Sequence, residues 1–166
     1  MAIHASARRA NAKARVFSTV ETWSLTGGPL VVFESDNART DQESAWVRVT
    51  LIPSTTAWAG HLTSSFQAVD TRALLVCDVF VKDGAAEGEV FDTYAPDRIA
   101  DDLEFNLRTF SVTMQDYATD PDNPTAVADA QITTVDPPSN VPLPKDGPWI
   151  RRQVSTELRW LAKHAV

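Results

Sequence analysis

The side chains best suited to act as a base and a nucleophile lie in a serine- and threonine-rich segment, residues 54–67. His61, oriented by Asp70 or Asp78, could remove a proton from Ser64 or Ser65, which is the arrangement that nucleophilic hydrolases use. The sequence around Ser64 lacks the glycine spacing of a nucleophile elbow, and the other two histidines lie near the two ends of the chain. A small hydrolytic or ligand-binding domain, with residues 54–67 as its lid, is therefore kept as an alternative.

Metal-binding patterns are incomplete. Asp116, Asp120 and Asp122 have the composition of a calcium loop. The glycine at the sharp turn and the distal glutamate of such a loop are missing, however, and Pro121 interrupts the spacing. None of the histidines has the helical spacing of a metal pair. We therefore predict neither a metal nor a cofactor, and a loose divalent site in this loop stays open.

A single cysteine, Cys77, excludes an internal disulfide framework and a multi-cysteine zinc site. It lies in the most apolar segment of the chain, residues 73–81, and is interpreted as a small core residue. Asp101 and Asp102, as neighbours on a helix, would point in different directions. That arrangement does not suit paired acid–base catalysis, and the chain is predicted not to be an enzyme.

Three aromatic side chains stand in polar segments where a monomer would expose them. Trp58 and Phe66 lie among Thr, Ser and Gly, and Tyr117 begins a stretch rich in Asp, Asn and Pro. A large apolar side chain outside the periodic core is a candidate interface anchor. We predict an interface that contains these three residues and His61. The alternative is that these segments fold back onto the sheet.

The composition is that of one acidic domain spanning residues 1–166. The chain has 15 Lys+Arg against 22 Asp+Glu, a formal net charge of −7, and 43% hydrophobic residues. A chain of this length can bury one core without cross-links. Its negative charge argues against general affinity for nucleic-acid backbones. No apolar run approaches the length of about 18 residues that indicates a membrane span.

Charges of opposite sign are separated along the chain. Basic side chains dominate near the start, with Arg8 and Arg9, and again late in the sequence, with Arg151 and Arg152. The middle of the chain, residues 83–122, is strongly acidic. Surface patches of opposite sign allow copies of a domain to associate head to tail or around a ring. These four arginines are therefore candidate interface residues.

Hydrophobic periodicity predicts two helices. Val16, Phe17 and Val20 form an apolar stripe at helical spacing, and this N-terminal helix is expected to end before Gly27-Gly28-Pro29. A second helix is expected between residues 90 and 110, with Pro96 in its first turn. Its apolar face would consist of Ile99, Leu103, Leu107 and Phe110.

Strands are predicted at residues 30–33, 46–52, 73–81, 131–135 and 150 to about 161. The segment 73–81 is apolar on both faces and is expected at the centre of a sheet. Pro53 is expected to end the second strand, and residues 54–67 to form a protruding hairpin or a long loop. Residues 116–129 are predicted to be a loop, and residues 136–148 a proline-rich connector. This order predicts an α+β fold, with a mostly antiparallel sheet and two helices packed on one face.

The order of these segments resembles the tail terminator proteins of long-tailed bacteriophages and of related gene transfer agents. The resemblance begins with an Arg/Ala-rich N-terminal helix and the strand 46–52, which runs into proline and a small-polar hairpin. It continues with the strand 74–81, a glycine, and a helix at Arg98-Ile-Ala-Asp-Asp-Leu103. A late strand follows Gly147-Pro-Trp149. The resemblance covers most of the chain and consists of segment order rather than a signature motif.

The resemblance implies a structural protein of the virion, made in the cytoplasm of a bacterial host. Such proteins form a hexameric ring at the head-proximal end of the tail tube, stop tube growth and dock the head-completion proteins of the neck. DNA would pass through the ring without specific binding, because acidic side chains on the channel wall repel phosphates. Candidate wall residues are Glu87, Glu89, Asp101 and Asp102. The family contributes no catalytic residue and no cofactor.

Two alternatives remain beside the tail terminator. One is another ring protein of the head–tail connector or tail-completion type; the other is the ligand-binding or hydrolytic domain described above. We expect ring closure through a sheet edge and the N-terminal helix, and docking through residues 54–67 and 111–129. A stable ring would favour the ring proteins, whereas a deep apolar pocket beside His61 would favour the ligand-binding domain.

Overall fold

The computed structural model describes residues 5–34, 36–63, 66–83, 95–117 and 119–165. They form two α-helices, α1 (Ala5–Glu21) and α2 (Ala95–Arg108), and one short 3-10 helix, η1 (Thr40–Gln42). The strands are β1 (Leu30–Phe33), β2 (Ala45–Thr63), β3 (Phe66–Lys82), β4 (Ser111–Asp116), β5 (Thr125–Thr134), β6 (Ser139–Asp146) and β7 (Trp149–Ala165). The fold is therefore α+β with a mostly antiparallel sheet, as predicted.

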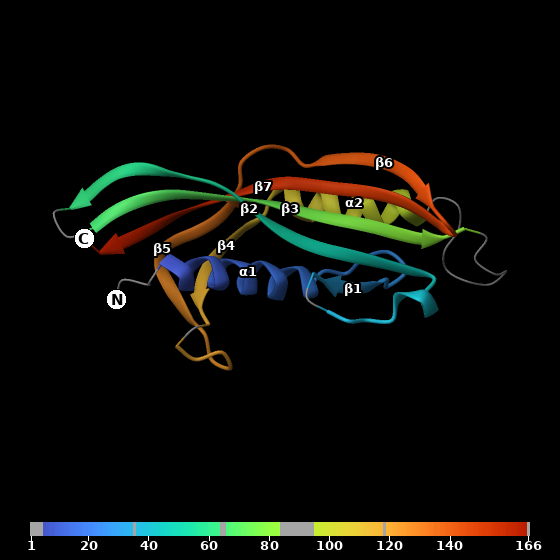
Figure 1. The fold of residues 1–166 in the computed structure, drawn as a ribbon, viewed down its shortest axis with the longest axis horizontal. Coiled ribbons are helices and arrows are strands. Elements are labelled where there is room, and N and C mark those ends of the chain that lie inside the picture. Colours follow the sequence, from blue (N-terminus) through green and yellow to red (C-terminus); the bar gives the residue numbers. More distant parts are fainter. Residues whose placement is uncertain (1–4, 35, 64–65, 84–94, 118, 166) are drawn as a thin grey trace.

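The strands form one curled sheet in the order β1-β2-β3-β7-β5-β4. Every pairing is antiparallel except that of β1 with β2. The long strands β2, β3 and β7 run side by side through the molecule (Figure 1). The outer edge of β7 pairs first with β6 and then, at Leu158 and Arg159, with β5. β7 is therefore an interior strand along much of its length.

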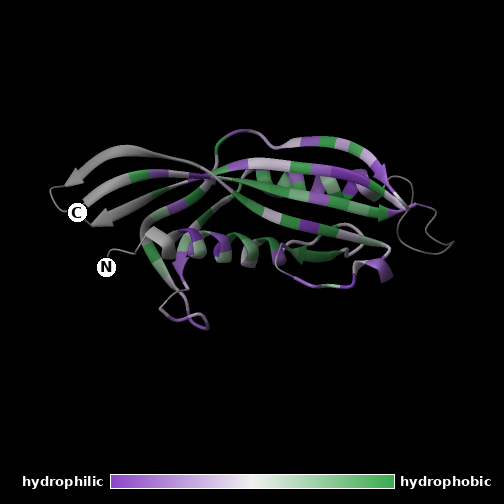
Figure 2. Cartoon of the chain, in the orientation of Figure 1, coloured by the Kyte–Doolittle hydropathy of each residue, from purple (hydrophilic) through white to green (hydrophobic). Residues whose placement is uncertain are grey.

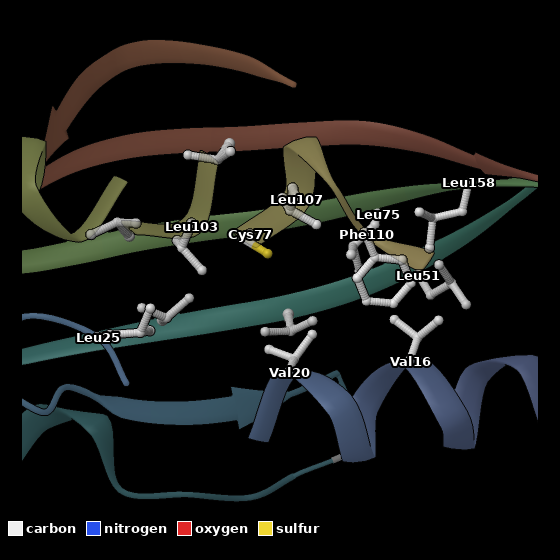
Figure 3. Packing of buried hydrophobic residues seen from close by; sticks show 14 of the residues in the cluster. Val16, Val20, Leu25, Leu51, Leu75, Cys77, Leu103, Leu107, Phe110 and Leu158 are labelled. Atoms are coloured by element: carbon white, nitrogen blue, oxygen red, sulfur yellow. The ribbon is translucent and has the colours of Figure 1, made fainter. Parts of the chain in front are cut away.

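Both helices contribute to one hydrophobic core against one face of this sheet. In β2 and β3 the odd-numbered residues face the helices: Val47 and Val49 alternate with exposed or half-buried neighbours, and Leu75, Cys77 and Val79 are fully buried. Val16 and Val20 of α1 and Leu103 and Leu107 of α2 approach the same interior (Figure 3). The apolar stripes predicted for the two helices are thus confirmed as their buried faces.

The curl of the sheet brings β4 against α1. The buried Asn11 donates from Nδ2 to Asp116 Oδ1 (3.3 Å) and accepts from the backbone N–H of Tyr117 (2.9 Å). Arg15 Nε donates to the carbonyl oxygen of Thr113 (2.9 Å). These side chains satisfy backbone groups at a strand edge that would otherwise remain unpaired, so they connect the N-terminal helix to the far edge of the sheet.

The expectation that Pro53 ends its strand is wrong. β2 continues past a register shift between Pro53 and Thr56 and pairs with β3 as far as Thr63. Residues 54–67 therefore belong to a hairpin, one of the two forms expected, whose turn at residues 64–65 lies outside the described residues. With the end of β7 this hairpin makes a three-stranded arm that extends beyond the helices (Figure 1). We call this part of β2, β3 and β7 the arm.

Two further segments differ from the predictions. Residues 116–129 do not form one long loop, because β4 runs to Asp116 and β5 begins at Thr125. Residues 136–148 are not an unstructured connector, because β6 occupies Ser139–Asp146 and pairs with β7. β6 contains Pro142 and Pro144 and pairs on one side only. Proline is tolerated at such an edge because its missing N–H interrupts no ladder on the free side.

Candidate protein-interaction surfaces

The sheet face turned away from the helices carries a cluster of aromatic rings. Trp46 stacks on Phe80 with ring centroids 3.9 Å apart and an interplanar angle of 1°. Trp149 meets both rings edge-on, at 6.2 and 6.5 Å. Arg151 and Arg48 lie over the Phe80 ring, at 4.9 and 5.6 Å. We call these five residues the aromatic–arginine cluster.

Two hydrogen-bond donors in this cluster are buried without a partner in the described part of the chain: Trp46 Nε1 and Arg151 Nε. The nearby Asp78 carboxylate accepts two hydrogen bonds. Arg48 Nη2 donates to Asp78 Oδ2 (3.1 Å), and Gln153 Nε2 donates to Asp78 Oδ1 (2.8 Å). Their own chain covers both atoms, so the parts of the cluster that a partner can contact are the partly exposed side chains of Trp46, Trp149 and Arg151.

Aliphatic side chains extend this surface along the strands. Ile52 and Leu74 are opposite each other in the β2–β3 register and are 47% and 37% exposed. Figure 2 shows apolar and polar positions alternating along the coloured part of β2, whereas the coloured part of β3 is largely hydrophobic. Trp, Phe and Arg, which dominate the aromatic–arginine cluster, are enriched in the cores of protein interfaces. The open face therefore has the composition of a protein-binding surface rather than of a solvated sheet.

The predicted interface residues of the hairpin fall in the arm. Trp58 is opposite Val69, and His61 is opposite Gln67, which is in turn opposite His164 of β7. Phe66 begins β3. The side chains of Trp58, His61 and Phe66 lie outside the described residues, so their role as interface anchors stays a prediction. Their backbone positions are in strands, not in an irregular loop.

Tyr117 differs from its predicted environment. It is half-buried against α1, where its hydroxyl lies 3.1 Å from Ser18 Oγ and donates to Gln115 Oε1 at 2.9 Å. The expectation that a monomer would expose this ring is therefore wrong. The alternative, that its segment folds back onto the body of the protein, is what the structure shows.

The four predicted interface arginines have different environments. Arg9 is exposed and forms no ion pair with a described residue, whereas Arg8 lies in α1 with its side chain outside the described part. Arg151 belongs to the aromatic–arginine cluster. Arg152 instead donates from Nη1 to Asp97 Oδ1 (2.6 Å) and from Nε to Asn140 Oδ1 (3.1 Å). Arg152 thus joins α2 and β6 within its own chain.

Two of the four acidic residues expected on a channel wall lie in the described structure, and their environments differ. Glu87 and Glu89 lie outside the described residues. Asp101 is exposed on α2, whereas Asp102 Oδ2 accepts hydrogen bonds from the backbone N–H (2.7 Å) and the hydroxyl (2.6 Å) of Thr26. Asp102 therefore fastens the segment after α1 to α2, and only Asp101 of this pair presents an unoccupied carboxylate.

A cavity of about 210 Å³ lies where α1 crosses β2, β3 and β7. Its walls are largely apolar and include Leu51, Ala73 and the ring of Trp160. The buried Trp160 Nε1 has no hydrogen-bond partner in the described part of the protein. Arg9 and Lys13 of α1 also line it, and Lys13 is bound to Glu34. The cavity thus combines a mostly apolar exposed surface with the charged side chains Arg9, Lys13, Glu34 and Arg72.

Cys77 is a core residue, as interpreted from the sequence. Burial, together with the neighbouring Asp78 carboxylate, raises the pKa of the Cys77 thiol from 9.0 to about 12. Such a thiol stays protonated and unreactive at neutral pH. In the part of the chain that the structure describes, no group of three or more His, Cys, Asp or Glu side chains could hold a metal ion. No described helix is long and apolar enough to cross a membrane.

Comparison with known proteins gives a fold but no function. One solved protein structure is similar over 95% of this chain and 96% of its own, with a TM-score of 0.56 and 14% sequence identity. Its name states no activity, ligand or partner, and at this identity the likeness concerns the fold alone. No family model and no curated protein matches the sequence.

Sequence reasoning missed most of the aromatic–arginine cluster. The predicted strand at 46–52 already placed Trp46 and Arg48 on one face, which was an available signal. Phe80 and Trp149 join them only through pairing, Phe80 opposite Trp46 and Trp149 opposite Lys82. That register joins three segments far apart in the chain, and a single sequence does not reveal it.

Proposed function

We propose that this chain is a tail terminator, a structural virion protein that assembles into a ring at the head-proximal end of a phage-type tail tube. The ring, a hexamer by resemblance, stops tube growth and offers a docking surface to head-completion proteins of the neck. DNA passes through it without specific binding. Another connector or tail-completion ring would assemble in the same way but would bind different proteins of the virion.

The observation that carries this proposal is the open face of the sheet. The five-residue aromatic–arginine cluster lies there, and the half-exposed Ile52 and Leu74 lie on the same face six residues away along β2 and β3. An interface core of this kind supports a protein whose work is association. The arm supports it further because it extends beyond the helices as a three-stranded element on which neighbouring molecules could dock (Figure 1).

The first experiment measures the mass of the purified protein by light scattering, with negative-stain imaging of the same sample. We expect a ring about six times the 18.2 kDa chain mass. The variant Arg151→Ala should weaken that assembly by at least about tenfold, because truncating a central interface arginine removes buried contacts and cation–π attraction. Lys145→Ala, at an exposed side chain that binds Asp83, is the matched control and should assemble normally.

The second experiment adds the protein to polymerising tail tube subunits and measures tube length. A terminator shortens tubes in proportion to its concentration and is found at one end only. A protein that neither forms rings nor binds tube ends would contradict the proposal. Rings that do not bind tube ends would favour a connector protein instead.

The cavity under α1 favours a second candidate, a small ligand-binding domain. Its apolar walls and flanking Arg9 would suit an anionic ligand with an apolar body. Native mass spectrometry of the purified monomer tests this candidate. A bound small molecule of constant mass would support it, and its loss in Ala10→Trp, which narrows the cavity, would locate the site.

A further inference from the structure

Phe105 is the most exposed large hydrophobic side chain in the described part of the protein. It lies on the outer side of α2 and is 76% exposed. Asp101 lies one turn earlier, so the two side chains are neighbours on the same helix face. Asp101 is exposed and has no hydrogen-bond or ion-pair partner among the described residues. The outer side of α2 therefore presents an aromatic ring beside a free carboxylate.

The cavity under α1 presents complementary chemistry. Its exposed surface is mostly apolar, although Arg72 and the paired Lys13 and Glu34 also line it, and its volume of about 210 Å³ is large enough for one aromatic ring. The ring of Trp160 in its wall can pack edge-on against a second aromatic ring. Arg9, beside this cavity, carries a guanidinium that is not paired with any described residue. The cavity and Arg9 thus match Phe105 and Asp101 in shape and in charge.

The two regions are too far apart to meet within one chain. Glu104, adjacent to Phe105, accepts a hydrogen bond from Asn140, which is opposite Val154 in β7. Trp160 lies six residues further along β7. At about 3.4 Å per residue the separation is roughly 20 Å. A contact between them therefore requires a second molecule.

We propose that Phe105 of one copy inserts into the α1 cavity of the next copy, where Asp101 pairs with Arg9. The contact joins two different surface regions, so it is heterologous, which is the type of contact that builds closed rings. This inference rests on the proposed ring assembly and specifies one of its subunit contacts. It assigns Asp101, expected on the channel wall, to the boundary between subunits.

Substitutions on each side test the contact by sedimentation velocity on the full chain. Phe105→Ser removes the inserted ring, and Ala10→Trp fills the cavity that Ala10 lines. Each should weaken self-association by at least about thirtyfold, the size expected for an interface hot spot. Val135→Ser, at another exposed apolar residue, is the control and should associate normally. Because both changed residues are exposed, the thermal midpoints should stay close to that of the unchanged protein.

A charge exchange tests the ion pair. Arg9→Glu and Asp101→Arg should each weaken association, and the double variant should restore it, since every copy then carries the reversed pair. Restoration by the double variant is a result that loss of folding cannot produce. Failure of the double variant to recover, with both single variants folded, overturns the pairing of Asp101 with Arg9.

Disulfide formation between two cysteine variants tests the contact even when no stable ring forms. Tagged Ala10→Cys protein is mixed with untagged Phe105→Cys protein under oxidising conditions, and the native Cys77 is buried and unreactive. The contact is supported if the yield of the mixed disulfide exceeds the yields of the disulfides that each variant forms with itself. In the control, Gln42→Cys replaces Phe105→Cys, and no mixed disulfide should form.

The outcomes separate the contact from the ring. A mixed disulfide with no ring, in solution or on tubes, keeps the contact and overturns the proposed function. Rings that are unaffected by Phe105→Ser and Ala10→Trp, without a mixed disulfide, overturn the contact and keep the proposed function. A small molecule that copurifies in the cavity and is displaced by Ala10→Trp also overturns the contact.

Discussion

The two faces of the central strands differ, although successive residues of the same strands supply them in alternation. On the face covered by the helices, side chains such as Val47, Leu75 and Val79 are aliphatic and fully buried. On the open face their immediate neighbours form stacked rings, an Asp78-centred hydrogen-bond network and half-exposed aliphatic contacts. One strand thus supplies the core with one set of residues and a recognition surface with the other.

This difference predicts whether a substitution changes the stability of the fold or its association with other molecules. On the covered face, the contribution of a residue to stability depends on the volume of its side chain, because these side chains interact through non-directional packing. The open face depends on particular pairs, such as Trp46 with Phe80, whose geometry is directional. We therefore expect changes on the covered face to lower stability, and changes at the rim of the open face to alter association while leaving the fold intact.

The strongest test of this comparison uses two adjacent leucines. Leu75 is 0% exposed on the covered face, and Leu74 is 37% exposed on the open face. Leu75→Ala should lower the free energy of unfolding by about 2–5 kcal/mol, because it leaves a cavity in the core. Leu74→Ala should cost about 1 kcal/mol or less, because its side chain is only partly removed from water. Urea denaturation of both variants measures this, and equal losses would refute the division between the faces.

A smaller effect is expected at Asp78, the buried carboxylate of the open face. Asp78→Asn should lower the free energy of unfolding by about 1–3 kcal/mol, because both hydrogen bonds lose a charged acceptor and an amide NH2 that cannot accept replaces one of the two buried oxygens. Asp146→Asn is the matched control, since Asp146 is exposed and lies 3.9 Å from Arg151. Its cost should be about 0.5 kcal/mol or less. Thermal unfolding of both variants compares them, and similar costs would show that the Asp78 network is dispensable.

The smallest effect concerns Glu104, which lies at the helix side of the sheet. Hydrogen bonds from Arg108 (2.6 Å) and Asn140 (3.2 Å) lower the pKa of its carboxyl below 4.5. A group with a lowered folded-state pKa stabilises the protein above its unfolded pKa and loses that contribution as the pH falls through the folded value. Glu104→Gln should therefore remove part of the stability lost below pH 4.5, about 0.3–0.5 kcal/mol for a pair of this type.

The measurement for Glu104 is the free energy of unfolding between pH 7 and pH 3 for both proteins. The two curves should converge toward low pH. Parallel curves would show that the carboxylate of Glu104 contributes nothing through its charge.

Much of the fold was predictable because local signals agreed with the tertiary structure. The alternation in 46–52, the apolar run in 73–81 and the spacing of Ile99 and Leu103 each correspond to an observed element. The failures occurred where position in the sheet overrides local preference. β1 pairs with β2 only up to Val49, so the outer side of Pro53 lacks a neighbouring strand, and β6 is likewise an edge where two prolines are tolerated.

The candidate surfaces were less predictable than the fold. Arg9 and Arg151 were identified from charge, and they line the cavity and the aromatic–arginine cluster respectively. Phe105 was not singled out, although it lies outside the apolar face that the spacing of Ile99, Leu103, Leu107 and Phe110 predicts. Only the angular position of Phe105 relative to Leu103 and Leu107, which are fully buried, separates an exposed ring from a packed one.

The interior position of β7 determines the order in which this chain can fold. β7 follows every other described element in sequence, yet it lies between β3 on one side and β5 and β6 on the other. The pairing of β3 with β7 brings Lys82 opposite Trp149 and Phe66 opposite Ala165. The chain segments between these residues are long, so bringing the two strands together is slow. During synthesis, β3 therefore has an unpaired edge until β7 leaves the ribosome. A chain shortened before Trp149 would keep that edge exposed and would be prone to edge-to-edge aggregation.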